Sequence, residues 1–520
     1  MSISKVLFFA AAFTALQSSA AEPKPKLIVS IVIDQFRHDY LTRFQNDYHG
    51  GLDYLLKHGA NLSSAYYEQI PTVTAVGHSI SLSGAMPSVS GIVGNSWFDR
   101  DENKIVTSVC DWHYVTVGGA QQKQADKCTD ADPASPNRLL VTTLGDELRN
   151  AHEDSRVVGV SIKARGAILP SGHRALGAFW FDDKTGNFVT SSFYMNQLPE
   201  WAESFNAEKL AAKYVDKKWP EFPARNFQAA SGRDLYSLLS ASPWGNELIE
   251  QFAEQAVKGE KLGQRGVTDL LTVSFSANDY VGHAVGPDAP EVRDMAIRVD
   301  EQIGKLFKLL DETVGMKNVL VILTADHGVA PTGAMDEKRK IPGGYLRANV
   351  EEAAQSALTK KFGQGDWLIP GGGETVLYLN YESIAKSKVS MDEVNQTITE
   401  AMLSAPQLHV TRVYTRMQLM NGVSGDFIGQ AQMNGFNERR SGDLFLIFEP
   451  NYIPGTSGTS HFSPYGYDRH VPLLFAGPGI KAGEYRNRVA VNDVAPTLAS
   501  MLEIEAPSGS AGRVLDEILK

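Results

Sequence analysis

Cysteine is nearly absent from this chain, whose 520 residues include only Cys110 and Cys128. Neither lies in a pattern typical of catalysis or metal binding, so we expect neither a thiolate nucleophile nor a cysteine-based metal site. If the chain is exported, we expect the two cysteines to pair and close a small loop. Two free thiols are the alternative.

Positive charge is also scarce. The chain has 49 Lys and Arg against 60 Asp and Glu, which gives a formal net charge of -11. This balance argues against a general nucleic-acid-binding surface. An acidic protein can still bind phosphate where positive charge is local, as metal ions or as a few basic side chains.

The sequence also lacks an apolar run long enough for a comfortable membrane span. A short apolar run lies near the N-terminus. Lys5 supplies a small positive region, residues 6–16 are apolar, and residues 18–21 are small. This pattern predicts a signal peptide over residues 1–21 and a periplasmic or secreted protein. A buried N-terminal strand or helix is the alternative. No cysteine lies near the cleavage site, so we expect no lipid anchor there.

What the sequence does contain is a set of apolar, β-branched runs typical of strands buried on both faces, as in a parallel sheet. They lie at residues 27–33, 156–162, 269–276 and 319–324. A helical apolar period from Val292 to Leu310 follows the third run. We therefore predict an α/β fold with a central, mostly parallel sheet flanked by helices.

Two regions interrupt this alternation, and we expect them to be insertions that form caps, at about 100–265 and 342–449. Within the first we predict a helix over 137–151 and a hairpin around residues 179–189. Within the second we predict strands at 375–379, 410–414 and 444–448. The rest of residues 22–520 is predicted to form one catalytic domain.

The stretch from Pro71 to Ser83 is the centre of our functional hypothesis. A threonine pair follows Pro71, and a helix-like run begins near Gly77. We place Thr74 at the helix N-cap, where its hydroxyl faces unpaired backbone N–H groups that suit an anion. The alternative is an ordinary threonine cap, and other residues decide between the two.

Those other residues are carboxylates and histidines at the predicted strand ends. Three predicted strands are followed by Asp34, Asp279 and Asp326. Ligands of open parallel sheets gather at the carboxyl ends of the strands, so we expect these side chains to meet. Asp279 precedes His283 by four positions, and His327 is adjacent to Asp326.

Oxygen and imidazole ligands without thiolates suit zinc, or a harder divalent ion. One further ligand is needed, and we favour His461 over His470 because His470 abuts a predicted strand. The number of ligands suits two metals about 4 Å apart, which can clamp both oxygens of an in-line displacement. A threonine hydroxyl bound to a metal can lose its proton near neutral pH.

A phosphoryl group also needs donors for its other oxygens. Asn95 lies in a glycine-rich loop downstream of Thr74, and Lys163 and Arg165 lie two positions apart at a predicted strand end, so they should point the same way. Arginine can bind a phosphoryl group bidentately, and lysine can act as a point charge. The alternative is a solvated basic pair.

These motifs, in this order, resemble the alkaline phosphatase superfamily, in its type I phosphodiesterase and nucleotide pyrophosphatase branch. The chain most resembles bacterial phosphate-irrepressible alkaline phosphatases that use threonine. The resemblance runs from Leu27 to near the C-terminus and implies an alkaline-phosphatase-like fold with two Zn²⁺ ions. It assigns one zinc site to Asp279, His283 and His461, and the other to Asp34, Asp326, His327 and the nucleophile Thr74. It matches Asn95, Lys163 and Arg165 to the phosphate-binding trio.

The chain also departs from some relatives. Diesterase and pyrophosphatase relatives usually carry Pro-Asn-His after the nucleophile, where this chain has Val76, Gly77 and His78. They lack the Lys–Arg pair, which favours a monoesterase here. Sulfatases of the superfamily need a Cys or Ser in a Cys/Ser-x-Pro-x-Arg motif, which we do not find at this site.

The resulting expectation is a zinc-dependent hydrolase of small-molecule phosphate monoesters, an alkaline phosphatase that acts through a phosphothreonine intermediate. A phosphodiesterase or nucleotide pyrophosphatase is the nearest alternative. A non-catalytic metal- or phosphate-binding protein of the cell exterior is an alternative of another class.

Overall fold

The computed structural model describes residues 24–120, 124, 132–214, 217–222, 236–371, 375–423 and 425–520. The predicted signal peptide lies outside the described residues, and so does Cys128 of the predicted disulfide. In the part of the chain that is described, no helix is long and apolar enough to cross a membrane.

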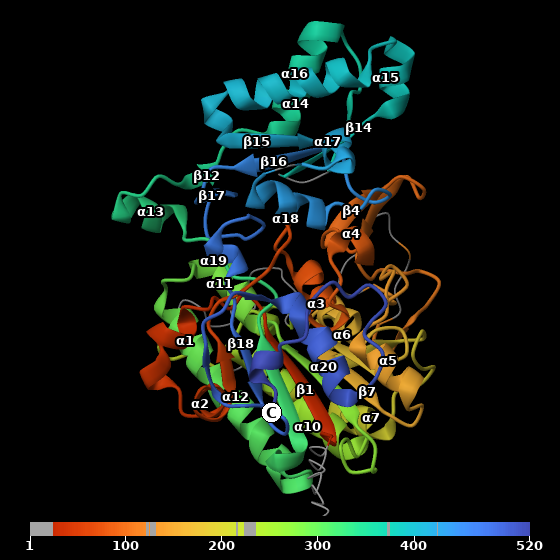
Figure 1. Cartoon of the computed structure of the whole chain (residues 1–520), viewed down its shortest axis with the longest axis vertical. Coiled ribbons are helices and arrows are strands. Elements are labelled where there is room, and N and C mark those ends of the chain that lie inside the picture. Colours follow the sequence, from red (N-terminus) through yellow and green to blue (C-terminus); the bar gives the residue numbers. More distant parts are fainter. Residues whose placement is uncertain are drawn as a thin grey trace, which may run out of the picture.

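A ten-stranded mixed sheet forms the centre of the molecule (Figure 1). From edge to edge its strands are β19 (Gly483–Tyr485), β2 (Ala60–Leu62), β18 (Leu473–Ala476), β11 (Val319–Thr324), β1 (Leu27–Ile33), β10 (Asp269–Phe275), β7 (Val157–Ser161), β8 (Gly177–Asp182), β9 (Asn187–Ser191) and β6 (Thr116–Val117). The five central strands from β11 to β8 are parallel, and antiparallel neighbours extend the sheet on both sides. This agrees with the predicted α/β architecture.

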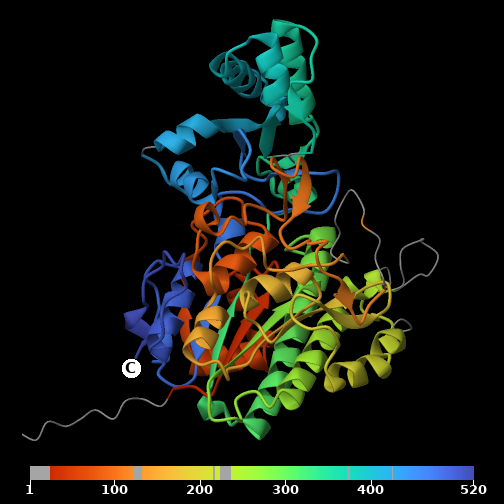
Figure 2. The same cartoon turned by 90° about the vertical axis from the view of Figure 1, so that its right-hand side faces the viewer.

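Helices cover both faces of the sheet (Figures 1 and 2), because the side chains of each buried strand alternate between two apolar clusters. In β1, Val29 and Ile31 pack in one cluster and Ile28 in the other. The first cluster includes α2 (Gly51–His58), α10 (Pro243–Gly259) and α12 (Pro290–Thr313). The helices of the opposite face are α3 (Thr74–Ser83), α5 (Leu144–Ala151), α6 (Ala164–Ser171) and α20 (Val494–Leu502).

The structure also contains short elements outside these layers. They are α1 (Tyr40–Arg43), β3 (Ala65–Tyr66), α4 (Pro87–Ser90), β4 (Ser96–Asp99), β5 (Lys104–Thr107), α7 (Glu200–Ala207), α8 (Leu210–Tyr214), α9 (Ser237–Ser240), α11 (Ala277–Val285), α13 (Gly333–Arg339), β12 (Gly344–Leu346), α17 (Arg416–Asn421), β17 (Tyr452–Pro454), α19 (Gly466–Arg469) and β20 (Val489–Ala490).

Two expectations for the region 100–265 need correction. The range does not form a separate insertion, because β7 pairs with β10 and β8 pairs with β7 inside the main sheet. The helix expected over 137–151 begins only at Leu144. The Thr143 side chain accepts a hydrogen bond from the Asp146 backbone N–H and caps the helix there.

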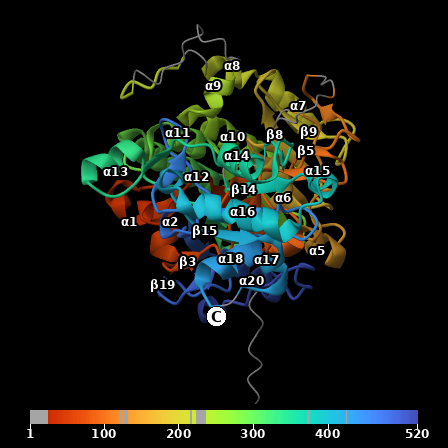
Figure 3. The same cartoon turned by 90° about the horizontal axis from the view of Figure 1, so that it is seen from above.

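A smaller unit lies over one end of the main sheet (Figures 1 and 3). Its sheet has the order β13 (Leu368–Ile369), β14 (Val376–Leu379), β16 (Leu444–Phe448) and β15 (Val410–Thr415), with antiparallel pairing. Its helices are α14 (Val350–Phe362), α15 (Tyr381–Ser387), α16 (Met391–Ser404) and α18 (Phe427–Gly435). The strands expected at 375–379, 410–414 and 444–448 correspond to β14, β15 and β16.

One buried carboxylate joins two helices that cover the sheet. Asp300 of α12 accepts hydrogen bonds from the backbone N–H groups of His49, Gly50 and Leu52 at 2.7–2.8 Å. These groups lie at the start of α2, where a helix has no internal acceptors for its N–H groups. Asp300 therefore caps α2 from a neighbouring helix.

We predict that Asp300→Ala lowers the free energy of unfolding by about 3 kcal/mol, because several buried N–H groups lose a charged acceptor. Scanning calorimetry of both proteins would measure this as a lower unfolding midpoint. The control is Asp53→Ala, which removes an exposed ion pair with Lys57 and should cost less than about 1 kcal/mol. Equal midpoints for wild type and Asp300→Ala would contradict the capping role.

Candidate active site

Three buried carboxylates converge at the carboxyl ends of the parallel strands. The strands end at one level, because the register pairs the last residues of β1 with Phe275 of β10 and Thr324 of β11. The carboxylates beyond them are Asp34, Asp279 and Asp326, and all three are buried. The predicted meeting of these side chains is present in the structure.

Three histidines face the same centre, and each is oriented by a backbone carbonyl. The Nδ1 atoms of His283, His461 and His327 lie 2.7, 2.8 and 2.9 Å from the carbonyl oxygens of Thr459, Thr72 and Gly328. A carbonyl oxygen only accepts, so Nδ1 carries a hydrogen and Nε2 is the nitrogen that faces the centre. This is the usual arrangement of histidines that bind metals.

The ligand atoms form two groups that could each hold a cation. One group is Asp279, His283 and His461, and the other is Asp34, Asp279 and His327, with all atoms of a group within 4.8 Å of one another. Asp279 belongs to both groups. The first group contains the three residues predicted together from the sequence.

Asp326 lies at the side of the second group. Its Oδ2 is 3.3 Å from Nε2 of His327 and 3.4 Å from Nδ1 of His78. Burial raises the pKa of the Asp326 carboxyl to about 6. Burial also lowers the pKa of His327, which keeps that imidazole neutral and suited to act as a ligand.

Thr74 lies at the start of α3 and faces this centre. Its Oγ1 is 3.4 Å from Nε2 of His327, and the side chain is buried. The helix begins one residue earlier than expected: Val73 is the N-cap, and Thr74 is the first helical residue. The next N–H group, that of Ala75, donates to Oδ1 of Asn95 at 2.8 Å.

A glycine allows α3 to come this close to the strand ends. A Cβ atom at Gly77 would lie 2.1 Å from the carbonyl oxygen of Asp326. No side chain fits at that distance, so the helix can pack on the Asp326 backbone only with glycine here. Gly77 takes the place of Asn in the Pro-Asn-His pattern of the diesterase relatives, and it is the residue at which α3 contacts the Asp326 backbone.

Lys163 is completely enclosed by this cluster. Its Nζ donates to Oδ2 of Asp34 at 2.6 Å and to Oδ2 of Asp279 at 2.7 Å. Burial alone would lower the pKa of Lys163, but Asp279 and Asp34 raise it instead. Burial likewise favours a higher pKa for Asp279, which Lys163 and His283 outweigh, so that its pKa lies well below the usual value.

The two basic residues predicted to act together differ in setting. Because α6 begins at Ala164, the two-residue repeat of a strand does not apply to Lys163 and Arg165, and their expected common direction does not follow. Arg165 lies half-buried in the first turn of α6. His470, the rejected candidate, lies elsewhere, with its ring stacked on those of His38 and Tyr66.

Gln35 belongs to the site and was missed by the sequence analysis. Its backbone N–H donates to Oδ1 of Asp326 at 3.1 Å, and its Nε2 donates to Oδ1 of Asp279 at 2.7 Å. Gln35 has a φ of 56°, which is uncommon for a residue with a side chain. Gly282 leaves it room, since a Cβ there would meet Gln35 Oε1 at 1.9 Å. Its position directly after Asp34 was the only available signal.

The cluster fits divalent cations. Three buried carboxylates face one buried ammonium group, and two of their oxygens, Asp34 Oδ1 and Asp326 Oδ2, have no hydrogen-bond partner. Unpaired buried carboxylate oxygens are costly unless a cation compensates them. With the three imidazole Nε2 atoms, the donor set contains oxygen and nitrogen only, which suits zinc and harder metals.

The fold is that of the alkaline phosphatase superfamily. A crystal structure of wild-type alkaline phosphatase PafA superposes with a TM-score of 0.88 at 34% identity and covers 96% of this chain and 100% of that chain. Murine ectonucleotide pyrophosphatase / phosphodiesterase 5 has the same fold, with a TM-score of 0.56 at 16% identity.

Within this superfamily, residues 28–467 match the family model of type I phosphodiesterase / nucleotide pyrophosphatase, and the chain belongs to that family. Alkaline phosphatase PafA of Elizabethkingia meningoseptica is 35% identical over 97% of this chain and 96% of its own length. Alkaline phosphatase PhoV of Synechococcus elongatus is 36% identical over 96% of this chain and 93% of its own length.

We predict that Lys163→Met destabilises the protein in chelator by about 3–5 kcal/mol, because it leaves two buried carboxylates without their ammonium partner. Thermal unfolding of wild type and variant, in EDTA and in excess Zn²⁺, measures the effect. The difference between the two proteins should be smaller in Zn²⁺.

Lys57→Met is the matched control, since Lys57 pairs with Asp53 at the surface and should shift the midpoint little. If Lys163→Met unfolds at the wild-type temperature in EDTA, the ion pairs of Lys163 do not stabilise the metal-free protein.

Proposed function

We propose that this chain is an alkaline phosphatase that hydrolyses small-molecule phosphate monoesters through a phosphothreonine intermediate. The observation that carries the proposal is the position of the Thr74 hydroxyl. It lies at the first turn of a helix, 3.4 Å from His327 Nε2, beside two groups of buried cation ligands. The near full-length similarity to alkaline phosphatases PafA and PhoV supports it.

The chain's own residues then have distinct roles. Thr74 Oγ attacks phosphorus and forms a bond to it while the bond to the leaving alcohol oxygen breaks. Asn95 is already held beside Thr74 by the Ala75 N–H group, and its free side-chain NH₂ is a donor for a phosphoryl oxygen. Arg165 supplies further donors from the start of α6. Water then hydrolyses the phosphothreonine and restores the hydroxyl.

We assign one zinc site to Asp279, His283 and His461, and the other to Asp34, Asp326, His327 and Thr74. Two Zn²⁺ ions, when bound, supply Lewis-acid chemistry that lowers the pKa of a hydroxyl and stabilises a leaving alkoxide. The first assignment coincides with one of the two ligand groups, and the second shares Asp34 and His327 with the other group, which contains Asp279 rather than Asp326. The buried Oδ2 of Asp326, which has no hydrogen-bond partner, supports its place as a ligand.

Lys163 completes the phosphate-binding trio in this proposal. It is paired with Asp34 and Asp279, so its ammonium group can turn to a phosphoryl oxygen only when those carboxylates have other positive partners. A solved PafA variant is substituted at one threonine, one asparagine, one lysine and one arginine, the same four residue types that we assign here.

The sequence supports two further parts of the proposal. The pattern of residues 1–21 supports export to the periplasm or beyond, where Cys110 and Cys128 would pair. The net charge of -11 supports a small-molecule substrate rather than nucleic acid.

We predict that Thr74→Ala reduces kcat for 4-nitrophenyl phosphate by at least about a thousandfold, because the nucleophile is lost. Zinc content, measured by elemental analysis, should remain close to that of wild type. Thr74→Ser keeps a hydroxyl and should retain turnover, and labelled substrate should trap a phosphoenzyme only in proteins with a hydroxyl at position 74. Full activity of Thr74→Ala would remove this residue from the proposed role.

We predict that Arg165→Ala lowers kcat/KM for 4-nitrophenyl phosphate by about a hundredfold, and for bis-4-nitrophenyl phosphate by less than about tenfold. A monoester carries more charge on its non-bridging oxygens than a diester, so it gains more from the guanidinium group. Arg293→Ala, which alters an exposed pair with Asp47, is the control.

The wild-type enzyme should prefer the monoester. Equal losses for both substrates in Arg165→Ala would make this residue structural. A wild-type preference for the diester would move the function to phosphodiester hydrolysis.

A further inference from the structure

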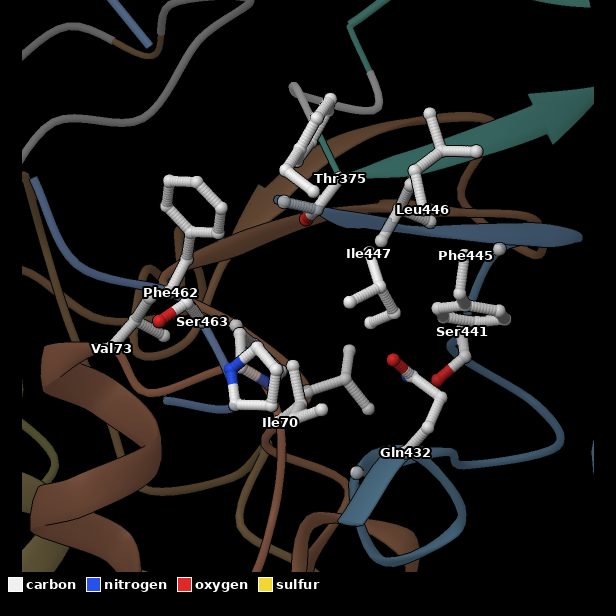
Figure 4. Close-up of a pocket in the computed structure, with 18 of the residues that line it drawn as sticks. Ile70, Val73, Thr375, Gln432, Ser441, Phe445, Leu446, Ile447, Phe462 and Ser463 are labelled. Atoms are coloured by element: carbon white, nitrogen blue, oxygen red, sulfur yellow. The ribbon is translucent and has the colours of Figure 1, made fainter. Parts of the chain in front are cut away.

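A pocket of about 240 Å³ lies between the smaller unit and the loops of the main domain (Figure 4). Strand β16 forms one wall, and helix α18 contributes Gln432 from below. The opposite wall comes from the loop before Thr74 and the loop after His461. The pocket is therefore shared between the catalytic domain and the unit above it.

The wall of this pocket is continuous with the active site. Val73 and Asn95 line the pocket. Val73 directly precedes Thr74 in the chain, and Asn95 accepts a hydrogen bond from the backbone N–H of Ala75, which follows Thr74. Phe462 and Ser463 also line it and follow His461 in the chain. Hydrogen bonds join the two loops, since Thr72 Oγ1 donates to the Ser463 carbonyl and His461 Nδ1 donates to the Thr72 carbonyl.

The smaller-unit wall of the pocket is largely apolar because it comes from β16. Phe445 and Ile447 of β16 pack with Ile70 and the α18 side of the unit. Leu446 and Phe448 also line the pocket, although they belong with Leu444 to a different cluster, which includes residues of α14 and α16. The alternation between the two clusters follows from the two-residue repeat of a strand.

The charge of the lining restricts what can enter. Among the described residues that line the pocket, Glu449 supplies the only carboxylate, and there is no lysine or arginine. A second phosphate or a carboxylate on the alcohol would find no cationic partner and would be desolvated at a cost. Figure 4 shows the Gln432 carboxamide and the Ser441 hydroxyl pointing into the same end of the pocket.

The volume restricts the ligand further. A cavity of about 150 Å³ is enough to hold benzene. At about 240 Å³, this pocket has room for one aromatic ring with a small substituent, but it is small for a ligand of several rings.

We propose that this pocket binds the alcohol part of the substrate and selects phosphate monoesters of single-ring, uncharged aromatic alcohols. The ring packs against Ile447 and Phe462, and Gln432 binds a polar substituent. The proposal rests on the proposed phosphatase function and adds the substrate class to it. The smaller unit thereby acts as the specificity element of the enzyme.

A partly buried ion pair connects the two walls of the pocket. Arg100 follows β4 in the chain, and Asp443 directly precedes β16. The Arg100 guanidinium group donates to Oδ2 of Asp443 at 2.5 Å. The same oxygen accepts from the Leu379 backbone N–H at 2.7 Å. Strand β4 begins one residue after Asn95, so this contact links the phosphate-binding loop to the small sheet and preorganises the pocket.

The test compares kcat/KM for phenyl phosphate with kcat/KM for methyl phosphate in each protein. Ile447→Trp fills the pocket, and we expect the phenyl-to-methyl ratio to fall at least about tenfold from its wild-type value. Met420→Trp is the matched control, because it adds the same ring at an exposed position of the smaller unit and should leave the ratio unchanged. Ile447→Phe is a milder variant that decides the question if Ile447→Trp does not fold.

Phosphonate inhibitors give a readout without turnover. We expect phenylphosphonate to inhibit wild type more strongly than methylphosphonate does. In Ile447→Trp, the ratio of the two inhibition constants should shift against phenylphosphonate by at least about tenfold. A ratio that stays at the wild-type value in the folded Ile447 variants would overturn the pocket assignment while leaving the phosphatase intact. A wild-type protein that hydrolyses neither ester would instead overturn the proposed function, and the pocket assignment with it.

Discussion

The structure depends on one concentration of buried negative charge. Asp34, Asp279 and Asp326 are brought together at the end of a parallel sheet, where water cannot screen them. Lys163 compensates for part of this charge through ion pairs of 2.6 and 2.7 Å, and two carboxylate oxygens remain without a hydrogen-bond partner. Such a cluster is stable only if further cations or protons join it. Affinity for metal ions is thus a consequence of how the strands end, and the phosphate chemistry that we propose follows from it.

The surrounding structure serves to hold this cluster in one geometry. Each histidine is fixed by a backbone carbonyl at Nδ1, and Gln35 links two of the carboxylates from a left-handed backbone conformation. Gly77 and Gly282 permit backbone and side-chain contacts that any larger residue would prevent. These contacts come from segments far apart in the chain. A small shift of one segment would therefore change the positions of several candidate ligands. Contacts of this kind control how well a preorganised site binds charge.

Much of this could be predicted from the sequence, for identifiable reasons. Strand β1 was predicted to the residue, because a run of aliphatic residues buried on both faces has few other interpretations. The meeting of Asp34, Asp279 and Asp326 followed from the rule that parallel strands end together. Lys163 was expected near the same site and does lie beside Asp34 and Asp279, but its pairing with both carboxylates was not foreseen, because a single sequence does not show which residues are close in space. Gln35 was missed for a related reason: its role depends on a backbone angle and on space left by a distant glycine.

The pocket between the smaller unit and the main domain could not be predicted from the sequence, although the strands β14, β15 and β16 of that unit could. The residues that we propose to be catalytic lie at strand ends and helix starts, where short motifs mark them. The pocket above them is formed by side chains such as Ile70, Phe445 and Ile447, which look like ordinary core residues in the sequence. The residue type does not distinguish a side chain that lines a pocket from one in the hydrophobic core, since both are apolar. The reaction type that we propose is therefore indicated by short motifs in the chain, whereas the proposed substrate choice depends on how two units of the chain meet. A fold by itself does not fix the substrate, which depends on the side chains at such a junction.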